Sequence, residues 1–325
     1  MAIHVDDYLS IASHKEENEH FKDQMWKVWT ISELGTVQFV VGIAISWDRE
    51  HQTVTLSQTA LIDKIVSQFG QTDANPLSAP LELGQKLRHI EHAKLSAEEQ
   101  MKLAALPYRS LVGCLLYLAI STRPDIVFAV QRLSQFLDSY SFEHWHATLC
   151  LIQYLKGTRD LKLYLGGNNP ISLLAYTDSD WASCLDTRRS VGGYMCLLGS
   201  GAISWTAHKQ KTVAASSCEA EYVAAFEVAK ECIWICTLLA AIGYASLMLT
   251  PMFCDNMASI SLSEDPLLHS CIKHVDIRFH FLCEHIQSQE LTVSYVNTCN
   301  NIADLFTKAL DVKQFTRLHG FLGLA

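Results

Sequence analysis

The second half of the sequence predicts an α/β (α+β) domain in which helices flank a mixed β-sheet. Three strand-like segments follow one another after residue 171, and helical segments then alternate with strand-like ones. This order is typical of a sheet that contains both antiparallel and parallel strands and packs helices on its faces. A run of loop-forming residues, Gly166-Gly167-Asn168-Asn169-Pro170, precedes the first of these strands and indicates a domain boundary.

Hydrophobic periodicity predicts the individual elements of this domain. Strands are expected at Ser172–Thr177, Gly193–Leu198, Ala202–Ala207, Leu247–Cys254 and Leu291–Val296. Helices are expected at Ser217–Ile242, Asn256–Ser263, His274–Gln287 and Ile302–Ala309. The apolar stretch from Cys232 to Leu249 is nearly long enough to span a bilayer, but Gly243 and Ser246 interrupt it. We interpret it as a buried helix, a turn and a buried strand.

The first half of the sequence is organised differently. It predicts a strand–turn–strand unit over residues 1–14, a helix over 15–30, strands at Val37–Trp47 and Thr53–Ser57, and a helix at Gln58–Phe69. Polar residues with two prolines predict an exposed linker, and three helical segments follow: Tyr108–Ile120, Asp125–Leu137 and Trp145–Lys156. The expected domains are therefore 1–70, a linker over 71–104, a helical region over 105–168, and 169–325.

Composition narrows the class of protein. With 325 residues, 49% of them hydrophobic and 18% charged, the chain can bury real cores and is not expected to be disordered. The formal net charge of −9 gives no global sign of nucleic-acid binding, although local basic patches can serve that purpose. Eleven cysteines without a CxxC pair predict reduced thiols in the cytoplasm or nucleus, and the N-terminal residues do not resemble a signal peptide. We expect no membrane partner.

Four carboxylates fall at the expected ends of elements. Asp178 ends the first strand of the domain, Glu221 lies in the first turns of the long helix, Asp255 follows the buried strand, and Asp304 opens the last helix. A two-metal nuclease needs several such acids around Mg²⁺ ions about 3.5–4 Å apart, because hard cations take oxygen ligands. Any one of these acids alone would be explained equally well as a helix cap or a dipole partner. Four together predict a metal site.

The long helix offers a second acid, Glu219. At about 100° per residue, Glu221 lies roughly 50° from the centre of the apolar face and Glu219 roughly 150° from it. Only an acid at the edge of the buried face can reach metal ions at the sheet. Glu221 is therefore the candidate ligand. Asp180 competes with Asp178 less well, because it follows the expected end of the strand.

Basic and hydroxyl side chains near these acids are candidate contacts for a nucleic acid. The densest basic cluster consists of His208, Lys209 and Lys211 together with Arg188 and Arg189. These side chains could bind phosphates or simply form a solvated surface. Ser216 and Ser217 precede the long helix, where they could contact a 2′-hydroxyl group or cap the helix, or do both.

At this point the sequence resembles a known family. The segments AYTDSDWASCLDTRRSVGGYMCLLGSGAISWTAHKQKTVAASSCEAEYVAA, KHVDIRFHFLCEHI and NNIADLFTKAL resemble the ribonuclease H region of copia-type LTR retrotransposon Pol polyproteins. HVDDYLSIASH resembles the polymerase catalytic hairpin of the same polyproteins, and YRSLVGCLLYLAISTRPDIVFAVQRLSQF with HWHATLCLIQYLKGTRDLKLYLG resembles their connecting region.

The resemblance implies a function and a set of site residues. It implies a ribonuclease H-like domain that cleaves the RNA strand of RNA–DNA hybrids with two Mg²⁺ ions, or with Mn²⁺ in their place. Asp178, Glu221, Asp255 and Asp304 match the four carboxylates that are both catalytic and metal-binding in the family. The competing hypothesis, from a different class, is a non-catalytic relic or nucleic-acid-binding module derived from a retrotransposon.

The polymerase half departs from the family pattern. His4 stands where the family has a tyrosine, Ser32 stands where it has a lysine, and Asp6 lies close to the start of the sequence. The polymerase needs a further aspartate on an earlier strand, so Asp6 and Asp7 are expected to be a remnant of its metal site. We therefore expect residues 1–168 to be an incomplete palm, thumb and connection region with no independent DNA synthesis, unless a second chain supplies the missing elements.

Overall fold

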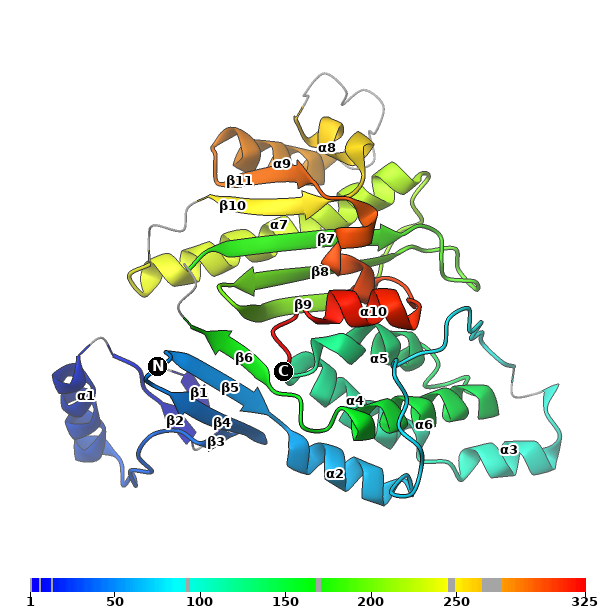
Figure 1. Ribbon diagram of the computed structural model, residues 1–325, viewed down its shortest axis with the longest axis horizontal. Helices are drawn as coiled ribbons and strands as arrows, with labels where there is room; N and C mark the ends of the chain where they lie inside the picture. The colour runs from blue at the N-terminus through cyan, green and yellow to red at the C-terminus, as the bar shows by residue number, and fades with distance from the viewer. Residues whose placement is uncertain are drawn as a thin grey trace.

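The computed structural model describes residues 2–5, 7–12, 14–91, 94–167, 171–244, 249–264 and 276–325. Its largest sheet has five strands in the order β11-β10-β7-β8-β9 (Figure 1). These strands are β7 (Leu173–Asp180), β8 (Val191–Leu198), β9 (Gly201–Lys209), β10 (Thr250–Cys254) and β11 (Leu291–Tyr295). β7, β8 and β9 pair antiparallel, whereas β10 runs parallel to both β7 and β11. The expected mixed sheet is confirmed.

The first strand of the sheet is longer than periodicity predicted. β7 continues to Asp180, so Asp178 lies inside the strand and the expectation that it ends the strand is wrong. The continuation depends on the backbone, because Asp178, Ser179 and Asp180 pair with Gly193, Gly192 and Val191 of β8. Backbone pairing of this kind does not require apolar side chains. Asp180 is consequently a strand residue as well.

One face of the sheet is covered by a long helix, α7 (Ser217–Ala241), which crosses the strands in Figure 1. The helix buries Tyr222, Val228, Cys232 and Ile235 against the sheet and against α9 (Asp276–Gln287). α8 (Met257–Glu264) packs beside α7 and α9. The expected beginnings of the fourth strand and of the third helix fall on residues 247–248 and 274–275, outside the described residues.

A second core joins the opposite side of β8 and β9 to helices from the first half of the chain. Those helices are α2 (Thr59–Gln68), α4 (Tyr108–Ser121), η2 (Pro124–Ile126), α5 (Val127–Ser134) and α6 (Phe142–Gly157). The C-terminal elements η5 (Thr298–Asn300), η6 (Ile302–Phe306) and α10 (Val312–His319) complete this layer. Leu115, Leu151, Met195 and Phe306 all belong to one buried cluster, so residues from both halves of the chain share a core. The helix expected at Ile302–Ala309 is a 3₁₀ segment.

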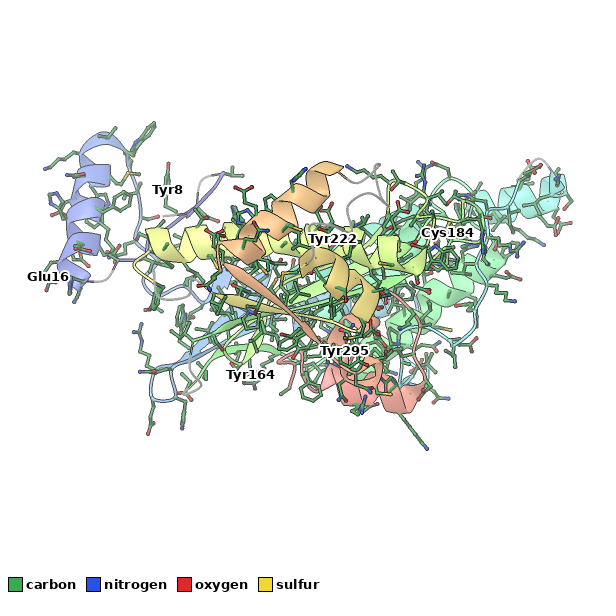
Figure 2. All side chains as sticks on the ribbon, turned by 90° about the horizontal axis from the view of Figure 1, so that it is seen from above. Tyr8, Glu16, Tyr164, Cys184, Tyr222 and Tyr295 are labelled. Atoms are coloured by element: carbon green, nitrogen blue, oxygen red, sulfur yellow. The ribbon has the colours of Figure 1, made fainter. Side chains whose placement is uncertain are left out.

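The N-terminal part contributes a smaller sheet. β3 (Phe39–Val40), β4 (Ile43–Asp48), β5 (Thr53–Ser57) and β6 (Leu163–Gly166) form it in that order. The single strand expected over Val37–Trp47 is wrong, because Val41 and Gly42 both adopt positive φ and form a tight turn between β3 and β4. The hairpin of β1 (Ala2–His4) and β2 (Asp7–Leu9) and the helix α1 (Lys15–Val28) project from the rest, as Tyr8 and Glu16 show in Figure 2.

Residues 71–104 are not uniformly exposed. Leu87 is fully buried, and α3 (Ala97–Ala104) begins with a capping box between Ser96 and Glu99. In the described part of the chain, one helical stretch, Ala97–Ser121, is long and apolar enough to cross a membrane. Its second part is α4, which places six residues in the shared core.

Candidate metal centre

Three of the four predicted acids meet at one end of the sheet. The carboxylate oxygens of Asp178, Asp255 and Asp304 lie within 4.8 Å of one another. Asp178 comes from β7, Asp255 directly follows β10, and Asp304 lies in η6. β7 and β10 are paired through Tyr176 and Phe253, so continuing this register by two residues places Asp178 opposite Asp255. The cluster is thus a consequence of parallel pairing between a strand that carries Asp178 near its end and a strand that Asp255 directly follows.

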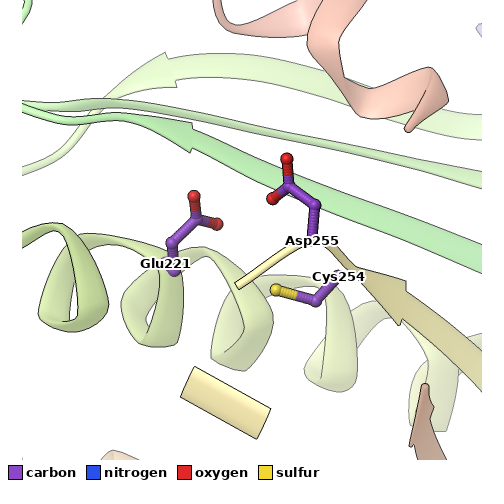
Figure 3. A group of neighbouring side chains, drawn as sticks. All are labelled: Glu221, Cys254 and Asp255. Carbon is purple, nitrogen blue, oxygen red and sulfur yellow. The ribbon is translucent and has the colours of Figure 1, made fainter. Parts of the chain in front are cut away.

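The fourth acid, Glu221, joins the cluster through Asp255. Oxygens of Glu221 and Asp255 and the Cys254 sulfur lie within 4.8 Å of one another. Figure 3 shows the two carboxylates on the same side, while the Cys254 side chain points away from the Asp255 carboxylate. Burial raises the pKa of the Cys254 thiol, so it stays protonated and is a poor ligand for a hard cation. The site is a set of carboxylates with a thiol beside it.

A lysine and a threonine that sequence reasoning did not single out complete the cluster. The Lys308 Nζ lies 2.9 Å from Oδ1 of Asp304 and 3.6 Å from Oδ2 of Asp178. The buried Thr307 hydroxyl donates a hydrogen bond to Oδ2 of Asp178. The signal in the sequence was the spacing of four residues between Asp304 and Lys308, which is typical of neighbouring charges on a helical segment.

The close approach of η6 to the sheet depends on a glycine. A Cβ atom placed on Gly193 would lie 2.5 Å from the Cβ of Phe306 and 3.0 Å from its carbonyl carbon. Gly193 is the cross-strand partner of Asp178, so the missing side chain lets η6 lie directly against the strand position that carries the acid. Asn301 ties the same segment to the sheet by donating a hydrogen bond of 2.9 Å from its Nδ2 to the Thr177 carbonyl oxygen.

Burial makes this cluster electrostatically costly. Asp178, Glu221 and Asp304 expose 2%, 6% and 3% of their surface. Burial, followed by the charges of Asp178 and Asp255, raises the pKa of Glu221 to about 10. Burial and the Asp178 charge likewise raise the pKa of Asp304 to about 7. Burial also raises the pKa of Asp255 and of Asp180. Like charges held together without water favour protonation, or a compensating cation.

The donor atoms fit a divalent metal ion. They are oxygens from several carboxylates, the ligands that hard cations such as Mg²⁺ and Ca²⁺ prefer. One of them, Oε2 of Glu221, is buried without a hydrogen-bond partner among the described residues. A buried acceptor of this kind needs an explanation, and an ion would provide it. The cluster formed by Asp178, Asp255 and Asp304 therefore has the composition and spacing of a metal-binding site.

The structure distributes the candidate basic residues unevenly. Arg188 and Arg189 lie in the loop after β7, where Arg188 is exposed and Arg189 is half-buried. Lys209 is the half-buried last residue of β9, and Lys211 is exposed just after it. His208 is also half-buried, and burial lowers its pKa, which disfavours a cationic role at neutral pH. It pairs across the strands with Gly192. The four other residues lie at the end of the sheet that carries Asp178.

The two candidate serines occupy the beginning of α7. Ser216 is the N-cap residue, and its hydroxyl accepts a hydrogen bond of 3.2 Å from the Glu219 backbone amide. Ser217 is the first residue of the helix and is exposed. The helix-capping interpretation of Ser216 is thus confirmed. Glu219, in turn, accepts a hydrogen bond of 2.7 Å from the Ala215 amide, whereas Glu221 faces the acids.

The candidate remnant of the polymerase site lies elsewhere. Asp6 is outside the described residues, and Asp7 is an exposed residue of the β1–β2 hairpin. Among the described residues, Asp7 belongs to neither group of acids that could hold a metal ion.

The strand order and the acids at the shared end of β7 and β10 define a ribonuclease H-like fold with an acidic cluster. Two solved structures are similar to part of the chain. The similarity to the N-terminal ribonuclease H domain of rv2228c from Mycobacterium tuberculosis extends over 46% of this chain and 96% of the solved chain, at 10% identity and a TM-score of 0.31. The similarity to ribonuclease H1 of Halobacterium salinarum extends over 42% of this chain and 94% of the solved chain, at 16% identity and a TM-score of 0.27. Because both scores are low, the fold class rests on strand order and register.

Sequence comparisons identify the family. Residues 1–83 match the family model described as reverse transcriptase (RNA-dependent DNA polymerase). A retrovirus-related Pol polyprotein from transposon TNT 1-94 of Nicotiana tabacum is 35% identical over 100% of this chain and 24% of its own length. The polyprotein from transposon RE2 of Arabidopsis thaliana is 33% identical over 100% of this chain and 22% of its own. An uncharacterized mitochondrial protein of A. thaliana is 34% identical over 72% of this chain and 93% of its own.

The chain belongs to the copia-type retrotransposon Pol polyprotein family, and contains a reverse transcriptase part followed by a ribonuclease H-like region. It spans less than a quarter of the length of the two polyproteins.

Proposed function

We propose that this chain is a metal-dependent endonuclease that cleaves the RNA strand of RNA–DNA hybrids. The observation that supports it most directly is the convergence of Asp178, Asp255 and Asp304, with Glu221 beside Asp255, at one end of a ribonuclease H-like sheet. These four residues would hold two Mg²⁺ ions, with Mn²⁺ as a substitute. When bound, such ions activate water and stabilise the leaving oxygen of a phosphodiester.

The residues of the chain have distinct parts in this proposal. Thr307 orients the Asp178 carboxylate through its hydroxyl group, and Gly193 lets η6 bring Asp304 close to the sheet. Lys308 keeps positive charge beside Asp178 and Asp304. The low dielectric of a buried cluster strengthens the attraction of these acids for a divalent cation. The RNA strand would be distinguished from DNA by its 2′-hydroxyl groups.

The deciding experiment offers the full chain a labelled RNA–DNA hybrid with Mg²⁺, with Mn²⁺, and with a chelator. The Asp178→Asn variant keeps the size of the side chain but removes its charge, and we expect it to lower the cleavage rate at least about a hundredfold. Asp160→Asn is the matched control, because the Asp160 side chain is 86% exposed on the surface. It should cleave like the parent chain.

The results separate this proposal from the non-catalytic alternative. Metal-dependent cleavage that is lost in Asp178→Asn and kept in Asp160→Asn supports the nuclease. Cleavage that persists in Asp178→Asn would exclude the acidic cluster as the active site. A folded parent chain, shown by circular dichroism, that binds the hybrid but never cleaves it would instead support the nucleic-acid-binding module.

A further inference from the structure

A buried thiol lies beside two acids of the metal centre. Cys254 is the last residue of β10 and is 0% exposed. Its sulfur, an oxygen of Glu221 and an oxygen of Asp255 lie within 4.8 Å of one another. Among the described residues, Asp178, Asp255 and Asp304 form the other group of this kind, so Asp255 belongs to both. One group offers oxygen atoms only, whereas the other offers oxygen and sulfur.

The surroundings of Cys254 differ from those of an ordinary core residue. Met252, two positions earlier on the same face of β10, packs into the apolar cluster between the sheet and α7. Cys254 belongs to neither apolar cluster in the described part of the chain. Figure 3 shows its side chain turned toward α7, the helix that carries Glu221. The sulfur accepts a hydrogen bond of 3.4 Å from the Asn256 backbone amide, and such a donor favours negative charge on the sulfur.

One acceptor in the group of Glu221, Cys254 and Asp255 lacks a hydrogen bond. Oε2 of Glu221 is buried without a partner among the described residues, and Glu221 exposes only 6% of its surface. Its carboxylate lies on the same side as that of Asp255 in Figure 3. A buried acceptor without a donor is evidence for an absent ligand, and a cation is one that satisfies it. Asp255 is half-buried, so a cation can reach the group from solvent past this residue.

The donor atoms of this group suit a cation softer than Mg²⁺. Zn²⁺ binds thiolate sulfur at about 2.3 Å and carboxylate oxygen at about 2.0–2.2 Å, and three protein ligands with one water molecule are a common set. Mg²⁺ takes oxygen ligands instead. The three donor atoms are already close, so small rotations of the Glu221 and Asp255 side chains would bring all of them around one zinc ion.

We propose that Glu221, Cys254 and Asp255 form a zinc site that shares two carboxylates with the magnesium centre, so that a bound Zn²⁺ ion blocks hybrid cleavage. As the Zn–S bond forms, the S–H bond of Cys254 breaks and its proton passes to the solvent. Zinc would then hold Glu221 and Asp255 away from the Mg²⁺ ions, which need both acids. Zinc binding does not depend on the chain being a nuclease, whereas the effect on cleavage rests on the proposed function.

Cobalt tests the thiol directly. Co²⁺ occupies zinc sites, and a thiolate bound to it gives a charge-transfer absorption band in the near ultraviolet. Equimolar Co²⁺ is added to the metal-free full chain, followed by Zn²⁺. We expect the band in the parent chain, its removal by zinc, and its loss both in Cys254→Ala and in Cys254→Ser, which keeps the size of the side chain.

Cys283→Ala is the matched control for the cobalt experiment. Cys283 is also buried, at 6% exposed, but in the described part of the chain it belongs to neither group of side chains that could hold a metal ion. This variant should keep the band. A parent chain without a thiolate band, or a band that persists in both Cys254 variants, would overturn the zinc site.

Metal affinities separate the thiol from the acids. Competition with a chelating dye should show that Cys254→Ala raises the Kd for Zn²⁺ at least about tenfold. The Kd for Mg²⁺ should stay within about twofold, because Mg²⁺ does not use the sulfur. Glu221→Gln should raise both Kd values, since Glu221 is shared. Equal zinc affinity in the parent chain and Cys254→Ala contradicts the proposal.

The effect on cleavage is measured by adding Zn²⁺ at a fixed Mg²⁺ concentration. Each chain is compared with its own rate without zinc, and Cys254→Ala should need at least about tenfold more zinc than the parent chain for half inhibition. Equal inhibition of the two chains would show that zinc does not block cleavage through Cys254. A parent chain that gives the cobalt band but never cleaves the hybrid keeps the zinc site and removes the nuclease.

Discussion

Lys308 and Asp304 form an ion pair of 2.9 Å inside the acidic cluster, four residues apart along the chain. The Lys308 side chain is 33% exposed, whereas that of Asp304 is 4% exposed, so the amine reaches from the rim into a buried group of acids. Its Nζ also lies 3.6 Å from Asp178. The Lys308 pKa is raised because the charges of Asp178 and Asp304 outweigh its burial. In the metal-free protein this lysine is the cation that offsets part of their repulsion.

Lys308→Met should therefore destabilise the metal-free protein. Removing the amine leaves buried acids without this compensation, and we expect a loss on the order of 2 kcal/mol, less than for a fully buried pair. Saturating Mg²⁺ should restore more stability to the variant than to the parent chain. Denaturant unfolding at pH 8, with chelator and with Mg²⁺, measures both effects.

Lys102→Met is the matched control for this prediction. Lys102 also pairs with an acid four residues away, Glu98 at 2.6 Å, but both side chains are exposed. We expect Lys102→Met to change the free energy of unfolding by less than about 0.5 kcal/mol. If Lys308→Met is as stable as the parent chain in chelator, Lys308 is not the compensating charge.

The raised pKa values of Glu221 and Asp304 predict a dependence of stability on pH. Both acids keep their protons in the folded state to higher pH than in the unfolded state, where they titrate near 4.5 and 3.8. The unfolded state then binds fewer protons, so stability falls as pH rises. Their contribution is complete below about pH 4. It is lost through about pH 7 for Asp304 and about pH 10 for Glu221.

Chemical denaturation in chelator between pH 5 and pH 9 tests this sign. The free energy of unfolding should fall as pH rises, by at most about 1.4 kcal/mol per pH unit for each group. Glu221→Gln should flatten the upper part of the curve, because the amide does not titrate. A metal-free parent chain whose stability rises over this interval would contradict the expected electrostatics of the cluster.

Gly193→Ala should disturb the site without altering any acid. The new Cβ would meet the Cβ of Phe306 at 2.5 Å and must displace η6, which carries Asp304. We expect a loss of about 1–3 kcal/mol from overpacking and a marked fall in hybrid cleavage. Gly113→Ala is the control, because a Cβ there meets nothing within 4 Å in an exposed position of α4. That variant should gain about 0.5–1 kcal/mol. Equal stability of the two variants in thermal unfolding would argue against the close packing of η6.

A buried ion pair lies where the first half of the chain meets the C-terminal helix. The Arg123 guanidinium donates two hydrogen bonds to Asp125, at 2.9 and 2.7 Å, and Tyr154 donates a third at 2.7 Å. The His319 ring of α10 lies 3.8 Å from the same carboxylate. The Arg123 charge and hydrogen bonds hold the Asp125 pKa below its ordinary value despite complete burial. This group connects η2 and α6 to the C-terminal helix.

Arg123→Met should consequently cost about 3–5 kcal/mol, because it leaves a buried carboxylate without its partner. Arg159→Met, which removes a half-exposed pair with Asp63 at 3.0 Å, should cost less than about 1 kcal/mol. Adding Asp125→Leu to Arg123→Met should recover part of the loss. Urea denaturation of the three variants measures these differences, and equal losses for the two arginine variants would show that burial does not matter here.

Local patterns in the sequence were sufficient to predict much of the candidate site. Local hydrophobic patterns predicted the five strands of the main sheet, and a periodicity of about 100° per residue distinguished Glu221 from Glu219 on α7. The structure buries Glu221 beside Asp255 and leaves Glu219 to hold the Ala215 amide. These features depend on neighbours close along the chain, which sequence periodicity reports directly.

Contacts between residues far apart in the sequence determined the features of the fold and the site that local patterns did not predict. The extension of β7 past Asp178 depends on backbone pairing with β8, and the place of η6 depends on the absence of a side chain at Gly193. The ion pairs of Lys308 and the approach of Cys254 to Glu221 join segments whose spacing alone does not specify their contacts. The sequence by itself determined which residues carry charge and which face of each element is apolar. Only the tertiary structure determined which of them meet, because their distances depend on how the sheet and helices pack together.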